Sequence, residues 1–485
     1  MALTDNEISE ITERILRELN GKPSAARPVL LPTPAHRTTP EDGRGVFVDL
    51  DQAIEAARRA QKALLDLGLA RRFILVEQMR AVCESSAELW GKMAAAETGL
   101  GKAHHKTSKI RLVAAKTPGP EDLRPESFSG DHGLTLVEPA PYGVVGVITP
   151  STNPVATIIN NAISLISAGN ACIFNAHPAA DNVCRTTASA LNEAIVAAGG
   201  PDNVITYIAN PTQESAQAMM KHRAIDLLLV TGGMAVVRLA MRSGKRAICA
   251  GPGNPPAIVD ETAIIPQAAR DLVTGAGFDN NILCTDEKEI FAVEKIANQL
   301  KREMVAQGAF ELTGTEIDKM TRLLIADDPV GRGHRHVRVN KRFVGKDLEV
   351  ICRELDIKPP LGAQIAIMET NWDHPLVMAE QLLPVIPFVR CRSFEEAMEW
   401  AVTAEHGFKH TFVMHSTNVA NLSTMAQVCQ ANIFVKNGPN MAGLGYGGEG
   451  YATMSIAGTS GEGLTKASTF TRPRRCTLVD YFRII

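Results

Sequence analysis

The most constraining feature of this sequence is an alternation of short apolar segments with helical stretches between residues 144 and 249. The apolar segments are rich in Val, Ile and Leu, which is typical of strands buried on both faces. A helical stretch separates most of them, and this alternation predicts an α/β fold with a doubly wound parallel sheet. The predicted strands are 144–148, 171–174, 204–208, 227–230 and 247–249.

Length and periodicity bound the rest of the fold. Residues 47–116 are rich in Ala and show helical periodicity, so we expect a helical layer there. At about 150 residues per domain, the 485 residues leave room for about three compact units.

Charge and cysteine usage exclude several classes of protein. The 50 Lys and Arg residues nearly balance the 53 Asp and Glu residues, so the chain lacks the basic excess of a nucleic-acid binder. The 9 cysteines are scattered, with no C-x-x-C pair, which disfavours both a disulfide framework and a zinc knuckle. No apolar run approaches the roughly 18 residues needed to cross a bilayer, and no signal-peptide pattern is present. We therefore expect a soluble, cytoplasmic protein with small-molecule partners and no nucleic-acid or membrane partner.

The N-terminal segment differs from the body of the chain. Residues 1–20 place Ile8, Ile11 and Ile15 on one helical stripe, which predicts a short amphipathic helix. Residues 21–44 are rich in proline and lack apolar periodicity, so we expect a flexible or extended linker there. A tethered helix with an apolar stripe favours docking into a partner's groove, and an oligomer contact is the alternative.

The loops that follow the predicted strands are the expected ligand contacts, because parallel sheets bind ligands at the carboxyl ends of their strands. The loop after residue 148 leads to a helix with Asn153 at the N-cap and Pro154 at its first position. Its free amides suit an anion or an oxyanion, although a plain helix cap explains the pattern equally well. His177 follows the next strand, where a lone histidine is more often without special function. The four loops of interest begin at Thr149, Asn175, Asn210 and Thr231.

Among the cysteines, Cys284 has the most suggestive surroundings. The run 278–284 reads FDNNILC, so polar side chains and amides approach the thiol just after a helical stretch that ends in glycines. A nucleophilic cysteine requires such donors. Local sequence alone leaves inert packing as the alternative.

Two other patterns give weaker signals. Residues 443–448 match G-x-G-x-x-G, but no amphipathic helix follows, which indicates a loop. Residues 332–346 are basic, and we interpret them as a solvated face rather than a phosphate site. His334 and His336 supply only two ligands, so no metal site is predicted.

Taken in order, several motifs resemble those of one family. From about residue 47 to 485 the chain resembles the aldehyde dehydrogenase superfamily, and within it the CoA-acylating propionaldehyde and acetaldehyde dehydrogenases of bacterial microcompartments for propanediol or ethanolamine use. The motifs are ITPSTNP (148–154), FNAHP (174–178), TGG (231–233), AGPGN (250–254), FDNNILC (278–284), HP (374–375), EQLLP (380–384) and the stretch 461–476.

The resemblance implies a two-step mechanism. Cys284 is the implied nucleophile, which attacks an aldehyde such as propanal or acetaldehyde to form a thioacyl-enzyme. The oxyanion would be held by the Cys284 amide and by Asn153. Thr152 competes for the second role, because the family's usual Pro-Trp-Asn is one residue longer here. The implied cofactor is NAD, with NADP as an alternative, and CoA is the co-substrate.

The resemblance also implies which residues bind the cofactor. The 231–233 motif would meet the pyrophosphate, and Glu380 would bind the nicotinamide ribose. His177 stands where the family usually has a lysine that binds the adenosine ribose. The implied cofactor-binding residues are Thr149, Pro150, Ser151, His177, Thr231, Gly232, Gly233 and Glu380.

One departure from the family pattern bears on the product. Hydrolytic members carry a Glu-Leu-Gly-Gly loop whose glutamate activates water, but residues 250–253 read AGPG and contain no carboxylate. A CoA thiol needs no such base, so the loss fits an acyl-CoA product. A hydrolytic aldehyde dehydrogenase and a non-catalytic structural member of the fold are the alternatives.

Family architecture implies discontinuous domains and assembly. An oligomerisation arm, formed in this family by the segments that correspond to 126–144 and 438–485, implies a homodimer or homotetramer. The helix at 1–20 resembles encapsulation peptides, which implies a microcompartment lumen and a shell or cargo protein as its partner. The implied units are a Rossmann-like NAD-binding domain (45–125 and 145–249), an inserted α/β catalytic domain (250–437), and an oligomerisation arm with the C-terminal segment (126–144 and 438–485).

Overall fold

The computed structural model describes residues 44–327 and 337–485. The expected helix at 1–20, nearly all of the linker at 21–44, and the two histidines at 334 and 336 lie outside the described residues. Within the described part, no helix is both long and apolar enough to cross a membrane.

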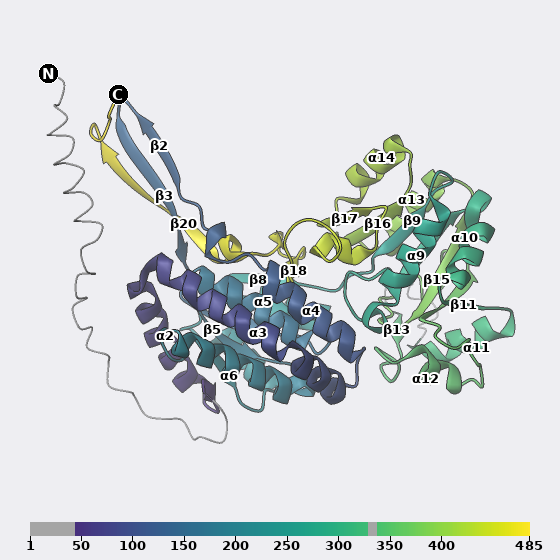
Figure 1. The fold of residues 1–485 in the computed structure, drawn as a ribbon, viewed down its shortest axis with the longest axis horizontal. Helices are drawn as coiled ribbons and strands as arrows, with labels where there is room; N and C mark the ends of the chain where they lie inside the picture. Colours follow the sequence, from purple (N-terminus) through teal and green to yellow (C-terminus); the bar gives the residue numbers. More distant parts are fainter. Residues whose placement is uncertain (1–43, 328–336) are drawn as a thin grey trace, which may run out of the picture. The chain divides into compact units, whose positions relative to one another are not determined.

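The predicted doubly wound sheet is present, and Figure 1 labels two of its strands, β5 and β8. It has six strands in the order β1-β6-β5-β4-β7-β8. Every neighbouring pair in it is parallel. The alternation of apolar and helical segments therefore identified the fold class and the strands after residue 144. The strands are β1 (Val46–Phe47), β4 (Val144–Ile148), β5 (Ala171–Asn175), β6 (Ile205–Ile208), β7 (Leu227–Thr231) and β8 (Ala247–Ala250).

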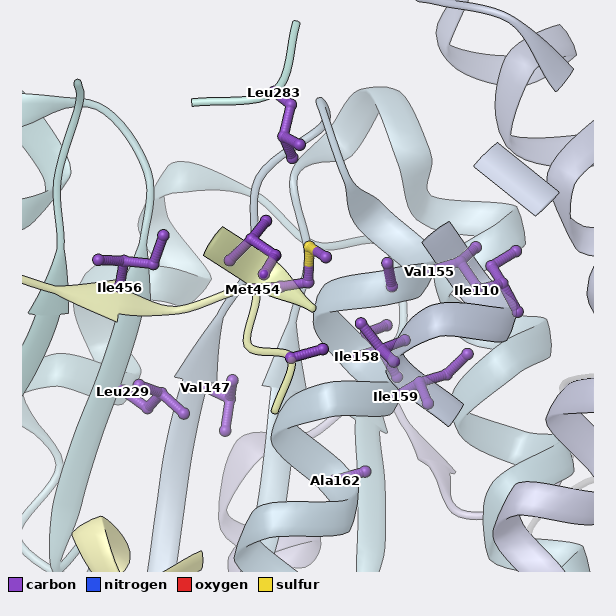
Figure 2. Packing of buried hydrophobic residues seen from close by; sticks show 14 of the residues in the cluster. Ile110, Val147, Val155, Ile158, Ile159, Ala162, Leu229, Leu283, Met454 and Ile456 are labelled. Atoms are coloured by element: carbon purple, nitrogen blue, oxygen red, sulfur yellow. The ribbon is translucent and has the colours of Figure 1, made fainter. Parts of the chain in front are cut away.

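Helices pack against this sheet, and the layer expected at 47–116 consists of three of them. Helix α5 is buried along its whole length, because it also contacts α3 and α4. Figure 2 shows its Val155 beside Ile110 of α4, in the same apolar cluster as Ile158 and as Val147 of β4. Burial of each such side chain contributes about 1.5–3 kcal/mol. The helices are α2 (Leu50–Asp66), α3 (Gly68–Thr98), α4 (Ala103–Lys116), α5 (Pro154–Ser167), α6 (Asp181–Ala197), α7 (Gln213–Lys221) and α8 (Met234–Met241).

A second parallel sheet has seven strands in the order β11-β14-β15-β10-β9-β16-β17. Its strands are β9 (Pro256–Val259), β10 (Glu289–Val293), β11 (Ala309–Leu312), β14 (Ile365–Thr370), β15 (Val385–Cys391), β16 (Thr411–His415) and β17 (Ile433–Lys436). Its helices are α9 (Ile265–Ala276), α10 (Glu294–Ala306), α11 (Thr315–Leu324), α12 (Leu348–Arg353), α13 (Phe394–Ala404) and α14 (Val419–Cys429).

The third sheet is antiparallel and joins distant parts of the chain. It contains β2 (Glu126–Gly130), β3 (Gly133–Pro141) and β20 (Thr471–Val479), with β3 in the middle. Large apolar side chains lie exposed on it, including Phe128 and Val479. Two small ribbons complete the strands, β12 (Ile325–Asp327) with β13 (Arg338–Val339) and β18 (Ile456–Ala457) with β19 (Gly463–Leu464).

Two further predictions can be compared with the structure. The G-x-G-x-x-G match is a loop: a short 3₁₀ helix, η5 (Asn440–Leu444), is followed by turns and no α-helix. All nine cysteines lie in the described part of the chain and all are free thiols.

Candidate active site

The strand order of the first sheet creates a ligand-binding crevice. From β4 the chain continues to β5 and β6 on one side, and then returns to β7 and β8 on the other. The loops after β4 and β7 therefore diverge at the carboxyl end of the sheet, which is where doubly wound sheets bind nucleotides.

Several of the predicted cofactor residues lie at this crevice. Thr149, Pro150 and Ser151 follow β4, and Thr149 is buried. Its hydroxyl has no oxygen or nitrogen partner among the described residues, and it forms a hydrogen bond with the Cys184 thiol. His177 follows β5 and is exposed, and its Nδ1 accepts a hydrogen bond from the amide of Ala179 at 3.2 Å. Burial and, to a lesser extent, Lys341 lower its pKa.

The loop after β7 opens a helix whose first amides have no side-chain cap. Thr231 ends the strand, and its hydroxyl lies 2.8 Å from the Ser455 hydroxyl. Gly233 is the N-cap of α8, and a Cβ at this position would meet nothing within 4 Å. Open space before free helix amides suits a phosphate group, and its place at the crevice of the sheet fits a dinucleotide.

The loop that carries Cys284 has an unusual backbone. Asp279, Asn280 and Asn281 have φ values of +47°, +59° and +64°, in a left-handed region that most residues avoid. Asp and Asn tolerate it best, and their side chains hold the loop in place. The Asn280 side-chain amide donates to the Gly345 carbonyl and the Asp347 carboxylate, at 3.0 and 2.9 Å. The Asp and Asn residues of the run FDNNILC therefore serve the backbone conformation of the loop, in addition to any role near the Cys284 thiol.

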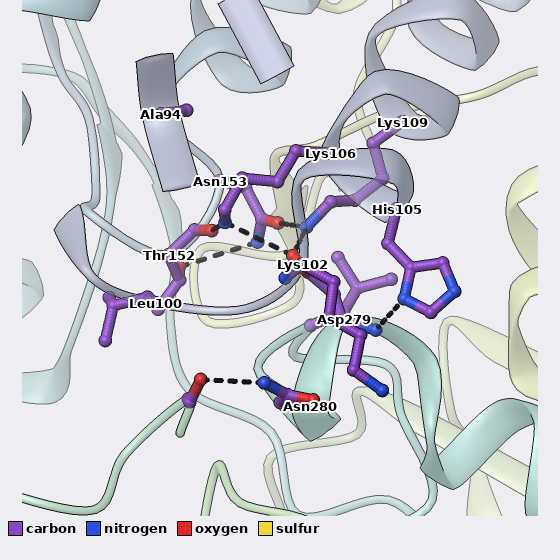
Figure 3. Close-up of polar contacts among 12 residues, drawn as sticks. Ala94, Leu100, Lys102, His105, Lys106, Lys109, Thr152, Asn153, Asp279 and Asn280 are labelled. Atoms are coloured by element: carbon purple, nitrogen blue, oxygen red, sulfur yellow. Dashed lines mark hydrogen bonds and ion pairs between the residues drawn. The ribbon is translucent and has the colours of Figure 1, made fainter. Parts of the chain in front are cut away.

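Asp279 binds the start of helix α4. Its Oδ1 accepts from the Lys102 amide at 2.6 Å, and its own amide donates to His105 Nδ1 at 2.9 Å. Its Oδ2 accepts from Lys106 Nζ at 3.3 Å and also from Lys109 Nζ. Figure 3 shows these side chains converging on the carboxylate from α4.

A buried lysine holds the other side of the loop. Lys288 Nζ donates to the carbonyl and the side-chain oxygen of Asn281, both at 2.7 Å, and to the Leu283 carbonyl at 3.0 Å. The charged run 285–289 around it is fully buried. Within that run, the Glu287 carboxylate accepts from the amide of Asn440 at 2.9 Å, which ties the loop to residues 440–444. Burial raises the pKa of Glu287 to about 7.

Asn153 occupies the predicted N-cap of α5, but its side chain does not cap the helix. Instead its Oδ1 accepts a hydrogen bond from Lys109, and its Nδ2 lies 3.5 Å from the Thr152 hydroxyl. The N-cap position of Asn153 was predicted correctly. The contact of its side chain with Lys109 was not predicted, because Lys109 comes from a separate helix.

Cys284 itself is half-buried, while seven of the other cysteines are buried and Cys476 is exposed. Burial and then the charge of Glu380 raise the pKa of its thiol to about 12, and Lys288 and its own backbone amide act in the opposite direction. Glu380, whose pKa is raised by burial, accepts from the Gly253 amide at 3.3 Å. Gly253 in turn approaches the nucleophile loop, because a Cβ there would lie 2.7 Å from the Cys284 carbonyl. Glu380 thus lies on the Cys284 side of the crevice.

The end of β8 provides no base for water. Ala250 ends the strand and is buried, and the following residues 251–253 carry no ionisable side chain. No carboxylate therefore lies on the loop 250–253 at this end of the sheet.

A mostly apolar pocket lies next to the nucleophile loop. Its walls combine the loop, helix α4 and residues 441–454. Its lining residues are Lys109, Leu112, Phe278, Leu283, Met441, Leu444, Tyr446 and Met454.

Several residues of the site were missed by the sequence analysis. Lys106 and Lys109 look like ordinary surface residues of an amphipathic helix, and only the fold buries them. His410 is also buried near Gly253, with its Nδ1 2.9 Å from the Thr411 hydroxyl. Burial and Lys288 lower its pKa to about 4, so its imidazole is neutral and weakly basic at physiological pH. Among residues 44–327 and 337–485, no group of three or more His, Cys, Asp or Glu side chains could hold a metal ion.

Comparisons with known proteins agree with this geometry. The sequence is 46% identical over 443 residues to the acetylating acetaldehyde dehydrogenase of Salmonella typhimurium, covering 91% of this chain and 94% of that protein. The structure is similar to that of the Rhodopseudomonas palustris propionaldehyde dehydrogenase, solved with bound CoA and an acylated cysteine (TM-score 0.86, 42% identity, 90% of this chain and 98% of that one). It is also similar to a propionaldehyde dehydrogenase from the Clostridium phytofermentans fucose utilisation bacterial microcompartment (TM-score 0.87, 44% identity, 91% and 100%).

The resemblance described above is thereby confirmed. The model of the aldehyde dehydrogenase family matches residues 43–468, which is most of the sequence. The chain belongs to the aldehyde dehydrogenase family.

Proposed function

We propose that this protein converts a short-chain aldehyde, CoA and NAD(P)⁺ to an acyl-CoA, NAD(P)H and a proton. The observation that carries the proposal is the pairing of the Cys284 thiol with a β8 end that has no carboxylate. Such a site can form a thioester but offers no base at this loop to hydrolyse it.

In the first half of the reaction, the Cys284 sulfur bonds to the aldehyde carbon and loses its proton. The oxygen of the resulting thiohemiacetal is negative, and the Cys284 amide and the Asn153 side-chain amide are the proposed donors to it. We assign this role to Asn153 rather than Thr152, because Lys109 binds the Asn153 oxygen and leaves the NH₂ group as the outward donor. Collapse of the oxyanion expels a hydride and leaves a thioester on Cys284.

NAD(P)⁺, when bound, supplies the hydride acceptor. The proposed contacts are Thr149, Pro150, Ser151 and His177 after β4 and β5, and the loop 231–233 at the start of α8. Glu380 is placed on the Cys284 side of the crevice, where a carboxylate suits ribose hydroxyls.

In the second half, the CoA sulfur attacks the thioester carbonyl and Cys284 leaves as thiolate. CoA thiolate is a far better nucleophile than water, so this step needs no base that generates hydroxide. The apolar side chains beside Leu283 are the proposed neighbours of the alkyl group of propanal or acetaldehyde.

The three sheets support a division of the chain into domains with different roles. We propose that the six-stranded sheet forms the cofactor domain, that the seven-stranded sheet forms the catalytic domain, and that β2, β3 and β20 form an oligomerisation arm. Phe128, Leu478 and Val479 expose apolar surface on the arm, as expected where a second copy packs. The proposed assembly is a homodimer or homotetramer.

We further propose that the enzyme works in the lumen of a bacterial microcompartment, with residues 1–20 as the segment that contacts a shell or cargo protein. A chain lacking residues 1–20 should keep its activity and lose co-sedimentation with shells. An unchanged distribution between shells and supernatant would contradict this assignment.

The activity is tested by mixing the protein with propanal, CoA and NAD⁺ and following the absorbance of the reduced cofactor. Cys284→Ala should abolish the signal, and a folded wild-type protein without any signal would reject the proposal. Equal rates with and without CoA would favour a hydrolytic enzyme. Repeating the assay with aldehydes of two to four carbons and with NADP⁺ identifies the preferred substrates.

A further inference from the structure

Two lysines and one aspartate form a buried cluster beside the proposed oxyanion site. Lys106 and Lys109 lie one turn apart on α4, with only 4% and 3% of their side chains exposed, and Asp279 is fully buried. Both lysines bind the same carboxylate oxygen. In Figure 3 they bridge the space between Asp279 and the 152–153 turn.

The charges of the cluster do not cancel. Burial opposes ionisation of Asp279, but the two lysines outweigh it and lower the pKa of the carboxyl group. Burial, and then Lys109, lowers the pKa of Lys106 to about 8, so Lys106 is mainly charged at neutral pH. The cluster thus carries one surplus positive charge in a buried place, an arrangement that is costly unless a negative charge develops nearby.

Lys109 also fixes the orientation of the Asn153 amide. A lysine ammonium has only donors, so it can bind only the oxygen of that amide. In the structure, Lys109 Nζ donates this hydrogen bond to Asn153 Oδ1. The Asn153 Nδ2 group points away from the lysine, and its contact with the Thr152 hydroxyl, at 3.5 Å, is at the limit of a hydrogen bond. Its donors therefore remain available for a bound group.

The backbone of the 152–153 turn is held by the same cluster. Lys106 Nζ donates to the Thr152 carbonyl at 3.2 Å while it binds Asp279. Asp279 lies in the same loop as Cys284, and its carboxylate accepts a hydrogen bond from the Lys102 amide. The carboxylate therefore connects the nucleophile loop, helix α4 and the asparagine that faces the oxyanion.

We propose that Lys109, held by Asp279, is a positioning residue that locks the Asn153 amide with its NH₂ group toward the thiohemiacetal oxyanion. The inference rests on the roles proposed above for Cys284 and Asn153. It predicts that Lys109 accelerates acylation through Asn153 and has little effect once Asn153 is removed.

The test is a double-mutant cycle on the full chain, measured as the pre-steady-state burst of reduced cofactor with propanal and NAD⁺. Asn153→Ala should slow the burst about 100- to 1000-fold, as expected for loss of one oxyanion donor. Lys109→Met should slow it by about 10-fold or more in the wild-type background. In the Asn153→Ala background the same change should cost about twofold or less.

Lys106→Met is the matched control, because Lys106 binds Asp279 and the Thr152 carbonyl but not the Asn153 side chain. It should slow the burst less than Lys109→Met, and by a similar factor in both backgrounds.

The outcomes separate this inference from the proposed function. If Lys109→Met slows the burst by the same factor in both backgrounds, Lys109 does not act through Asn153 and the inference is wrong. If Asn153→Ala leaves the burst unchanged, the proposed oxyanion role itself fails. Lys109→Met leaves Lys106 and Asp279 as a one-to-one pair, so we expect a folded protein. If thermal melting shows otherwise, Lys109→Gln takes its place: its amide can still donate to the Asn153 oxygen, so the burst should stay within about threefold of wild type, and a loss of about tenfold or more would contradict the inference.

Discussion

Replacing Lys288 by methionine should weaken the domain that carries Cys284. All three protons of the ammonium group are used, on two oxygens of Asn281 and on the Leu283 carbonyl. At about 1.5 kcal/mol for each hydrogen bond to a charged group, their loss costs about 4.5 kcal/mol. Methionine avoids the burial of a charge, which offsets part of this cost. We therefore expect a loss of about 3 kcal/mol, at the lower end of the range for removing one partner of a buried ion pair.

The change can be followed by urea unfolding with tryptophan fluorescence. Trp372 and Trp400 stack with ring centroids 5.8 Å apart, and Trp400 lies on α13, which packs against strands of the seven-stranded sheet. With a urea dependence of about 2 kcal/mol per molar, the midpoint of that domain should fall by about 1.5 M.

Lys301→Met is the control for this prediction. Lys301 also lies in the seven-stranded domain and binds Glu311 and Glu369 at 2.5 and 2.7 Å, but both carboxylates are about one-third exposed. Water can replace the lost contacts, so we expect a change of about 1 kcal/mol or less. Equal midpoints for the two variants, or no shift in Lys288→Met, would refute the reasoning that the buried ammonium holds the loop.

Two further predictions concern the thiol and its loop. Glu380→Gln removes a charge that raises the pKa of Cys284, so at pH 8 the thiolate fraction should rise and iodoacetamide should react about two- to tenfold faster. The rate is corrected with Cys284→Ala, because Cys476 is exposed, and an unchanged rate would contradict the effect of Glu380. Gly101→Ala would place a Cβ 2.1 Å from Asp279 Oδ1 at a φ of +68°, so both the melting temperature and the burst should fall. Gly68→Ala has a similar φ of +76° but an empty surrounding, so it should lower the melting temperature less and leave the burst unaffected.

Much of the fold was accessible from sequence because it depends on local patterns. The apolar segments after residue 144 are short, regularly spaced and flanked by helices, so their parallel pairing follows from general rules of α/β folds. The backbone position of Asn153 was accessible for the same reason, since Pro154 marks a helix start. Its side-chain partner was not, because Lys109 lies 44 positions earlier and only the fold brings them together.

Buried charges were the least predictable part of the site. The run 285–289 reads TDEKE and would usually indicate a solvated turn, yet every residue in it is buried. Its charges are satisfied by partners that come from elsewhere in the fold, such as Asn440 for Glu287. A charged residue in a sequence indicates that its side chain needs a polar partner. It does not indicate whether that partner is water or another part of the protein.

The pairing of β3 with β20 has a consequence for the timing of synthesis. Pro141 pairs with Thr471, so the two strands meet only after about 330 further residues have been made. At about 5–20 residues per second, β3 waits for roughly 15–65 seconds with one edge unpaired. If the arm joins subunits as proposed, a nascent chain cannot enter the oligomer through a finished arm until both parallel sheets have been translated. The late synthesis of β20 would then prevent incomplete chains from joining the oligomer through the arm.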